Sequence, residues 1–263
     1  MDPKEILVTG GTGSLGRRVV DRLRAAGREV RVLSRGGRPG TVRGDLSTGE
    51  GLEAAVRGVS TIVHCASHPF KTRQTDVGGT GLLLQEAART GVEHVVFISI
   101  VGVDRNPHFP YYRAKLDAES VVERSFVPWT ILRATQFHEL LLGAGRFLDR
   151  LPGVMPIPRG FRLQPMDVGE AADRLAELAL SEPAGRVPDV GGPEVLASAE
   201  LARAYLEAAG RKKRLVEIPV PGKAARAFRE GAQICPENKY GRIRWEEFLR
   251  ETFQRSDGLG RVS

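Results

Sequence analysis

The chain has 263 residues, of which 41% are hydrophobic and 27% charged. These values are near the averages for soluble globular proteins and exclude a disordered, coiled-coil or collagen-like chain. The net charge of +7 arises almost entirely after residue 210, because residues 211–263 hold 13 Lys and Arg against 7 Asp and Glu, and this placement argues against a nucleic-acid partner for the rest of the chain.

Residues 1–5 lack the basic-then-apolar order of a signal peptide, and no apolar run approaches the roughly 20 residues of a membrane helix. We therefore expect a cytoplasmic protein without a membrane partner. Cys65 and Cys235, the only cysteines, lie too far apart in sequence for a metal-ligand spacing, so we expect reduced, structural thiols and no metal site.

Short β-branched runs alternate with helical patterns through the first two-thirds of the chain, which is typical of βαβ units and a parallel sheet. Several of these runs are apolar throughout, as strands buried on both faces are. The pattern predicts a doubly wound α/β fold of the Rossmann type. The predicted strands are residues 6–8, 30–33, a short piece at Val42, 61–65, 95–98 and 129–132.

The first predicted strand runs directly into Thr9-Gly10-Gly11-Thr12-Gly13-Ser14-Leu15-Gly16. A helix follows, since Leu15, Val19 and Leu23 recur every four residues. Glycines at these spacings allow a tight turn and a close approach of the backbone to a pyrophosphate at the helix N-terminus. With a strand before and a helix after, the loop predicts dinucleotide binding.

The second predicted strand ends at Ser34 and Arg35. A site for NAD normally has an acidic residue here, which binds the adenosine ribose. An arginine instead can form charge-assisted hydrogen bonds to a 2′-phosphate, so we predict NADP(H) as the cofactor, with Arg38 close by. A solvated arginine in an arginine-rich chain is the alternative.

Prolines and glycines are dense between residues 151 and 165, which argues against long regular elements there. Helical patterns return from Val168 and from Ala199, and the basic run 211–214 follows Gly210 at a helix end. That run either satisfies terminal carbonyls or forms a polyanion-binding patch. We expect a nucleotide-binding domain over residues 1–135, completed by segments within 163–192, and a smaller substrate-cleft region over 136–263.

Taken in order, several motifs resemble the short-chain dehydrogenase/reductase superfamily, in particular its atypical NmrA-like branch. Beside the glycine loop these are Gly44-Asp45-Leu46, His64-Cys65-Ala66-Ser67, Asp76-Val77-Gly78-Gly79-Thr80, with Asp76 in place of an asparagine, and Gly191-Gly192-Pro193-Glu194. The resemblance implies that the cofactor contacts Gly10, Thr12, Gly13, Ser14, Leu15, Gly16, Ser34, Arg35, Asp45, Leu46, Ala66, Ser67 and Lys115. His64 and Cys65 themselves are expected to be packed rather than catalytic.

Tyr111 and Lys115 match the Y-x-x-x-K pattern of that superfamily. Residues four apart lie on one face of a helix, so the ammonium can stand near the phenol and favour its ionised form. The resemblance implies that Tyr111 is a general acid or base and that Lys115 also binds the nicotinamide ribose.

The catalytic hydroxyl of the superfamily has an uncertain counterpart. Ser99 precedes Tyr111 by 12 positions, close to the spacing of the shorter members, but falls about two residues early against the extended ones, where Val101 takes the place. Ser99 is thus either a hydrogen-bond donor to the substrate or a strand cap. Phe137 and His138 lie where the resemblance places substrate-binding residues, although core packing also accounts for Phe137.

The resemblance implies an NADP(H)-dependent oxidoreductase that acts on a small carbonyl or quinone-like substrate. One alternative is a regulatory protein that senses NADP(H) without turnover and binds a protein partner. A second is a sugar-nucleotide epimerase or dehydratase, which the missing acid after the second strand disfavours because such relatives commonly retain NAD.

Overall fold

The computed structural model describes residues 5–37, 39–67 and 73–259. The chain divides into two compact units, one made of Met1–Arg133 and Gly169–Pro188, the other of Ala134–Val168 and Asp189–Ser263. The predicted division at residue 135 falls two positions after the end of the first segment. Among the described residues, no helix has the length and apolar character needed to cross a membrane.

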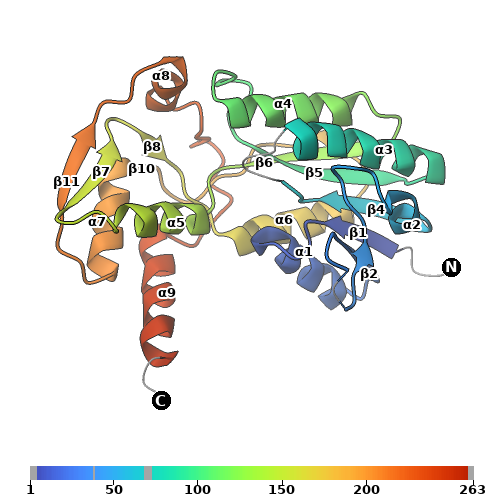
Figure 1. Cartoon of the computed structure of the whole chain (residues 1–263), viewed down its shortest axis with the longest axis horizontal. Coiled ribbons are helices and arrows are strands. Elements are labelled where there is room, and N and C mark those ends of the chain that lie inside the picture. Colours follow the sequence, from blue (N-terminus) through green and yellow to red (C-terminus); the bar gives the residue numbers. More distant parts are fainter. Residues whose placement is uncertain (1–4, 38, 68–72, 260–263) are drawn as a thin grey trace. The chain divides into compact units, whose positions relative to one another are not determined.

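The first unit is built on a seven-stranded sheet in the order β3-β2-β1-β4-β5-β6-β9. The neighbouring strands β1 and β2, β1 and β4, β2 and β3, β4 and β5, and β6 and β9 pair in parallel. Helices α3 and α4 cover one face, and α1 and α6 cover the other (Figure 1). This confirms the predicted doubly wound α/β fold. The strands are β1 Glu5–Thr9, β2 Val30–Ser34, β3 Val42–Arg43, β4 Val59–His64, β5 His94–Ile100, β6 Trp129–Ala134 and β9 Gly185–Arg186.

The helices of this unit are α1 Ser14–Ala25, α2 Leu52–Val56, the π-helix η1 Arg73–Gly78, α3 Gly79–Thr90, α4 Pro110–Glu123 and α6 Val168–Ala179. Helix α1 forms because Val19, Val20 and Leu23 bury one face while its arginines remain on the other. Helix α4 begins at Pro110, where the fixed φ of proline suits the first helical position. As a result Tyr111 lies in the first turn of α4.

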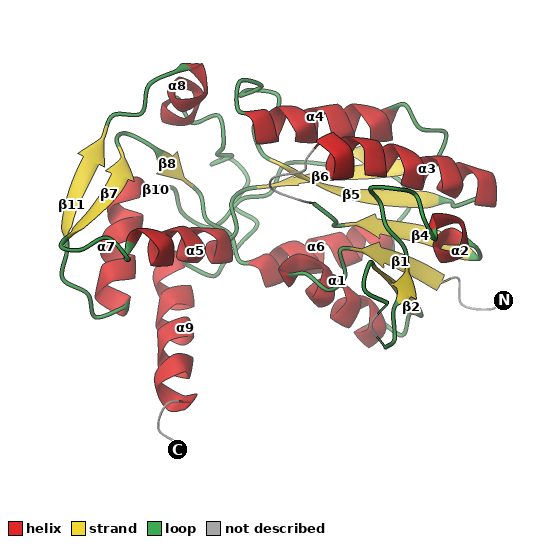
Figure 2. Ribbon diagram, viewed as in Figure 1, coloured by secondary structure: helices red, strands yellow, loops and turns green. Residues whose placement is uncertain are grey.

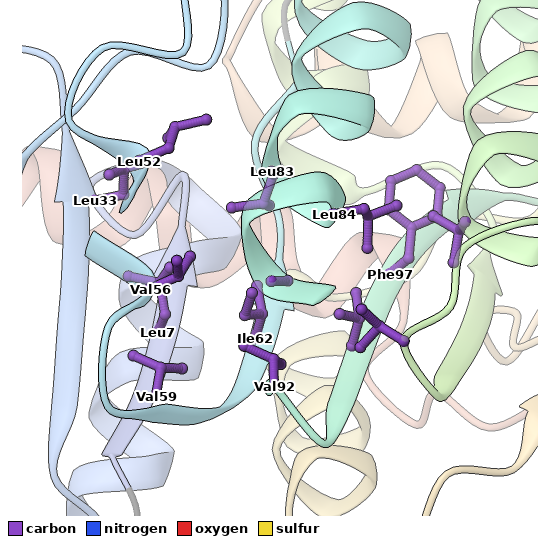
Figure 3. Packing of buried hydrophobic residues seen from close by; sticks show 14 of the residues in the cluster. Leu7, Leu33, Leu52, Val56, Val59, Ile62, Leu83, Leu84, Val92 and Phe97 are labelled. Atoms are coloured by element: carbon purple, nitrogen blue, oxygen red, sulfur yellow. The ribbon is translucent and has the colours of Figure 1, made fainter. Parts of the chain in front are cut away.

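A continuous apolar core lies between the sheet and helices α2, α3 and α4. Figure 3 shows Leu7 of β1, Ile62 of β4 and Phe97 of β5 beneath Leu83 and Leu84 of α3. The uninterrupted apolar runs of the sequence are these strands, buried on both faces. The core fixes the carboxyl ends of β1, β4 and β5 relative to one another.

The second unit contains helices α5 His138–Leu148, α7 Ser198–Ala208, α8 Lys223–Arg229 and α9 Trp245–Leu259. Two small sheets accompany them, one of β7 Val154–Pro158 with β11 Arg214–Ile218 and one of β8 Arg162–Leu163 with β10 Leu196–Ala197 (Figure 2). Its core includes Met155, Tyr205, Trp245 and Leu249.

Strand β7 corrects the expectation of an irregular stretch over residues 151–165. Its five residues pair with β11 in parallel, and Pro156 and Pro158 take part in the register. Proline lacks the amide hydrogen but is tolerated where a strand has one partner. Because β7 and β11 form a two-stranded sheet, β7 is such an edge strand.

The basic run 211–214 begins where α7 ends. Gly210 has a φ of +63°, and the Arg211 amide donates to the Leu206 carbonyl at 2.8 Å. The Lys213 ammonium pairs with the Asp149 carboxylate at 2.9 Å and donates to the Leu151 carbonyl at 2.6 Å. Lys213 thus contacts the end of α5, whereas the helix-end interpretation expected the cations to serve the end of the preceding helix, α7.

Candidate cofactor and active site

The glycine loop between β1 and α1 is shaped by missing side chains. Gly10 has a φ of +67°, and a Cβ there would lie 2.8 Å from backbone atoms of Ala66. A Cβ on Gly16 would collide with the Gly10 carbonyl oxygen, which accepts a hydrogen bond from the Gly13 amide at 2.9 Å. The first turn of α1 contains no acidic residue, so its free amides can receive an anion.

A groove of about 730 Å³ opens beside this loop. It lies at the carboxyl ends of β1, β2 and β4, and the strand order reverses between β1 and β4, which is where ligands bind in open α/β sheets. Nine predicted cofactor residues line it: Gly10, Thr12, Gly13, Ser34, Arg35, Asp45, Leu46, Ala66 and Ser67. The glycine cradle and the size of the groove fit a dinucleotide. Ser14, Leu15, Gly16 and Lys115 lie outside the lining.

The wall at the adenosine end of the groove is formed by the turn after β3. The Asp45 carboxylate accepts hydrogen bonds from the Ser47 amide at 2.8 Å and from the Ser47 hydroxyl at 2.7 Å. Arg35 is exposed directly after β2 and lines the same groove. Arg38, the other predicted basic neighbour, lies outside the described residues.

A buried chain of hydrogen bonds begins at the groove wall. The Ala66 amide donates to the Thr9 hydroxyl at 3.3 Å, the hydroxyls of Thr9 and Thr80 lie 2.6 and 2.9 Å from the two His64 ring nitrogens, and Thr80 donates to the Asp76 carbonyl at 2.5 Å. Since the Thr80 hydrogen is committed to that carbonyl, Nε2 of His64 donates to Thr80 and Nδ1 accepts from Thr9. This assignment requires a neutral ring.

Two side chains at the end of β4 remain uncharged. Burial, and to a smaller extent the Lys115 charge, lowers the pKa of His64 to about 3. Desolvation raises the pKa of the Cys65 thiol to about 12, against a smaller opposing effect of Lys115. His64 therefore has a structural role, and Cys65 is a protonated thiol in the groove wall.

Lys115 and Tyr111 lie one helical turn apart on α4. The Lys115 ammonium is 3% exposed and lies 3.6 Å from the Asp76 carboxylate. It donates to the Ile98 carbonyl at 3.2 Å and stands 4.6 Å from the centre of the Phe97 ring. Asp76 was not among the predicted site residues, although it takes the place of an asparagine in the superfamily motif.

The Tyr111 hydroxyl lies 3.1 Å from the Ser67 hydroxyl. Ser67 follows β4, is exposed and lines the groove, so this pair of hydroxyls is within reach of a ligand. Ser67 was predicted only as a cofactor contact. Its contact with Tyr111 could not be predicted from the sequence, because 44 positions separate the two residues.

Ser99 does not join this pair. Its side chain is buried, and its hydroxyl helps to lower the pKa of the Glu119 carboxylate. Ser99 is also absent from the lining of the groove. The assignment of Ser99 as a catalytic residue stays a prediction, and its burial does not favour it.

Glu119 is the centre of a buried ionic cluster that joins α4 to the sheet. It binds Arg133 of β6 through two hydrogen bonds of 2.8 and 2.7 Å and Arg186 of β9 at 2.8 Å. Burial raises the pKa of Glu119, but the bonds from Arg133, Ser99 and Arg186 outweigh burial and hold this pKa below its ordinary value. The cluster anchors the helix that carries Tyr111 and Lys115.

Phe137 and His138 belong to the second unit. Phe137 is partly buried at the start of α5, and its backbone bridges to Met166. The His138 ring is completely buried and packs against Trp245 and Phe248 with ring centres 5.6 and 4.9 Å away. Burial lowers the pKa of His138 to about 4. This packing speaks against the predicted substrate contact of His138.

Comparisons with known proteins agree with this site. Residues 10–140 match a family described as NAD(P)H-binding. The (4-alkanoyl-5-oxo-2,5-dihydrofuran-3-yl)methyl phosphate reductase of Streptomyces griseus is 30% identical, with 87% of this chain and 86% of that protein covered. The NAD(P)H azoreductase of Xenophilus azovorans is also 30% identical, with coverages of 81% and 77%. The photosystem II assembly factor Ycf39 of Trieres chinensis is 28% identical, with coverages of 82% and 72%.

Among solved structures, a short-chain dehydrogenase/reductase superfamily protein from Agrobacterium tumefaciens, crystallised with bound NAD, superimposes with a TM-score of 0.74. It is 23% identical, and the match covers 97% of this chain and 98% of that one. The likeness shows that the two chains share a fold.

Proposed function

This chain belongs to the NAD(P)H-binding family of short-chain dehydrogenase/reductase-like proteins, and we propose that it is an NADPH-dependent reductase of a small carbonyl or quinone-like substrate. The observation that carries the proposal is the pair of hydroxyls of Tyr111 and Ser67, 3.1 Å apart at the groove, with Lys115 one turn further along α4. A bound nicotinamide cofactor supplies a hydride, and the two hydroxyls are placed to serve the oxygen that gains charge.

Each residue has a distinct part in this proposal. Tyr111 donates a proton to the oxygen of the substrate, since a phenol whose hydroxyl lies beside the groove residue Ser67 can act as a general acid. Ser67 orients that oxygen by a hydrogen bond and takes the part that the sequence had offered to Ser99. Lys115 and the wall residues Ala66 and Ser67 hold the ribose next to the nicotinamide.

The preference for NADPH rests on Arg35, which is exposed and lines the groove. A charge-assisted hydrogen bond to the 2′-phosphate contributes about 1.5–3 kcal/mol, or about tenfold or more in affinity. Titration with NADPH and NADH tests this, and we expect tighter binding of NADPH in the wild type and a loss of that preference in Arg35→Asp. Equal affinities that do not change in the variant would remove the proposal of NADPH over NADH.

The activities named for two relatives support a reductase. One reduces a substituted dihydrofuranone phosphate and the other reduces azo compounds, according to their names. Both substrates are conjugated electrophiles. The test is consumption of NADPH, followed by its absorbance, with a panel of carbonyl, quinone and azo compounds.

Tyr111→Phe is expected to lower kcat by about 100-fold or more, since that is the usual contribution of a general acid, while the Kd of NADPH stays unchanged. Tyr112→Phe is the matched control, because Tyr112 is the neighbouring tyrosine but is buried in the unit. Full activity of Tyr111→Phe would refute the proton-donor role.

Binding without turnover is the second candidate function. The burial of Ser99 does not favour one expected catalytic hydroxyl, and Ycf39 is named as an assembly factor. A stable protein partner, recovered in pull-downs only with or only without NADPH, would favour this function. Turnover that is lost in Tyr111→Phe would favour the reductase.

A further inference from the structure

Lys115 is held by three described neighbours. Its ammonium donates one hydrogen bond to Ile98, lies 3.6 Å from a carboxylate oxygen of Asp76, and faces the ring of Phe97. An ammonium has three N–H donors, and the hydrogen bond to Ile98 uses one of them, while Asp76 attracts the ammonium by charge at 3.6 Å without a hydrogen bond. The remaining donors can serve a ligand hydroxyl.

Asp76 is held as firmly as its partner. Its side chain is 1% exposed, and its backbone carbonyl accepts the hydrogen bond from Thr80 that ends the chain through His64 and Thr9. Asp76 also lies in the π-helix η1, a wider turn that is frequent at functional sites. The carboxylate is thereby fixed beside Lys115 independently of any ligand.

Two described titratable groups near this pair carry no charge. His64 and Cys65 both sense Lys115, and both stay neutral. Within this cluster of described residues the Asp76 carboxylate therefore balances the Lys115 ammonium. Ion pairs far from water are sensitive to the loss of one partner, because the remaining charge is left without compensation.

We propose that Asp76 is a positioning residue that holds Lys115 and offsets its charge, and that the pair thereby sets the relative affinity of the site for the oxidised and the reduced nicotinamide. The inference rests on the proposed function, since it assumes that a nicotinamide binds near Lys115. The oxidised ring carries a positive charge and the reduced ring carries none. An unbalanced ammonium therefore repels NADP⁺ and leaves NADPH almost unaffected.

The experiment measures the Kd of NADP⁺, NADPH and adenosine 2′,5′-bisphosphate by calorimetry for the wild type and D76N. We expect D76N to weaken NADP⁺ relative to NADPH by about fivefold. Adenosine 2′,5′-bisphosphate lacks the nicotinamide half, so its Kd is expected to stay within about twofold of the wild type. D117N is the control. Asp117 is on α4, the helix of Lys115, but it forms an exposed pair with Arg113.

The opposite charge imbalance gives an independent test. K115M leaves the Asp76 carboxylate without its cation, so it is expected to shift the ratio of affinities toward NADP⁺ and to lower the Tm. The double variant D76N/K115M removes both charges, which restores the ratio to near that of the wild type and recovers part of the Tm. K115M also removes the hydrogen-bond donor of Lys115. This loss weakens NADP⁺ and NADPH equally, so it cancels in the ratio of their affinities. The double variant and K115M also serve if D76N alone does not fold.

The outcomes separate this inference from the proposed function. Should the wild type bind none of the three ligands, the proposed function fails. Binding by the wild type together with a ratio that is the same in D76N, K115M and the wild type overturns the role of Asp76 alone. A D76N variant that weakens all three ligands equally shows a purely structural residue and also overturns it.

Discussion

The two halves of the groove are built by different means. The half around Gly10 and Gly16 is formed by backbone that can approach closely because Cβ atoms are missing. The half around Tyr111 begins at Ser67 in the groove lining, and the Tyr111 hydroxyl beside Ser67 and the buried Lys115–Asp76 pair come from α4 and η1. A backbone cradle needs the right glycines over a few consecutive residues, whereas a side-chain site needs the whole unit to be folded.

The side-chain half is expected to fail first when its anchor is removed. Glu119→Ala leaves Arg133 and Arg186 without their shared carboxylate, and we expect a loss of about 3 kcal/mol in the free energy of unfolding, measured in urea. Because the pKa of Glu119 is lowered in the folded chain, its contribution to the free energy of unfolding is present at neutral pH and is lost as the pH falls. The difference between variant and wild type should therefore shrink in acid.

Glu53→Ala is the control for this anchor, because Glu53 forms an exposed pair with Arg57. Its expected cost is at most about 0.5 kcal/mol. Equal losses for the two glutamates would contradict the importance of the buried cluster.

The half of the groove formed by backbone is tested by adding one methyl group to a glycine. Gly10→Ala places a Cβ against Ala66, and we expect NADPH binding to weaken by about 100-fold, or about 2.7 kcal/mol. Gly27 has a similar φ of +74° but no atom within 4 Å of its added Cβ. Gly27→Ala should therefore cost stability, about 1–2 kcal/mol for the left-handed conformation, while calorimetry finds the Kd unchanged. Equal Kd values for the two variants would show that the cradle is not needed.

His64 connects the two halves, and its titration sharpens the comparison. The folded chain keeps the pKa of His64 near 3 through burial and the Lys115 charge, against 6.5 ordinarily. The unfolded chain therefore takes up a proton first, and stability falls as the pH drops from 6.5 toward 3. Between pH 6.5 and 5 the loss is about 2 kcal/mol.

Urea unfolding at pH 7, 6 and 5 measures this slope. The buried His138 contributes a second slope of the same sign, because its pKa is also lowered, to about 4. His64→Gln should remove one part of the dependence of stability on pH. An unchanged slope in His64→Gln would contradict the buried, neutral ring.

The smallest expected effect separates the two serines. Ser67→Ala should lower kcat about tenfold, or about 1.4 kcal/mol, because one of the two hydroxyls at the groove is lost. Ser99→Ala should leave kcat unchanged and reduce the Tm slightly, since its hydroxyl supports Glu119. A larger loss of kcat in Ser99→Ala than in Ser67→Ala would restore the assignment made from sequence spacing.

The parts of the fold that were predictable are those that local patterns encode. Apolar runs revealed strands β1 to β6 of the first unit but not the two-residue β9, and the four-residue spacing of Leu15, Val19 and Leu23 revealed α1. The glycine loop carried enough constraint to predict the cofactor groove. Between residues 151 and 165 the same rules underestimated the order, because the partner of β7 lies at Arg214–Ile218, far along the chain.

The buried charges were harder to predict. Lys115 and Glu119 are four residues apart on the buried face of α4, so a charged residue within that face was a visible signal. The sequence offers no measure of which acid compensates each cation, since Asp76 meets Lys115, and Glu119 meets Arg133, only through tertiary packing. The burial of Ser99 was hidden for the same reason, since spacing along the chain does not say which side chains pack over a position.

Pro156 and Pro158 have a consequence beyond local geometry. Strand β7 borders a two-stranded sheet, and such borders are where foreign chains can add by strand pairing. Two of its five residues have no amide hydrogen to offer a newcomer. The prolines that disguise this strand in the sequence therefore also make it a poor template for amyloid growth.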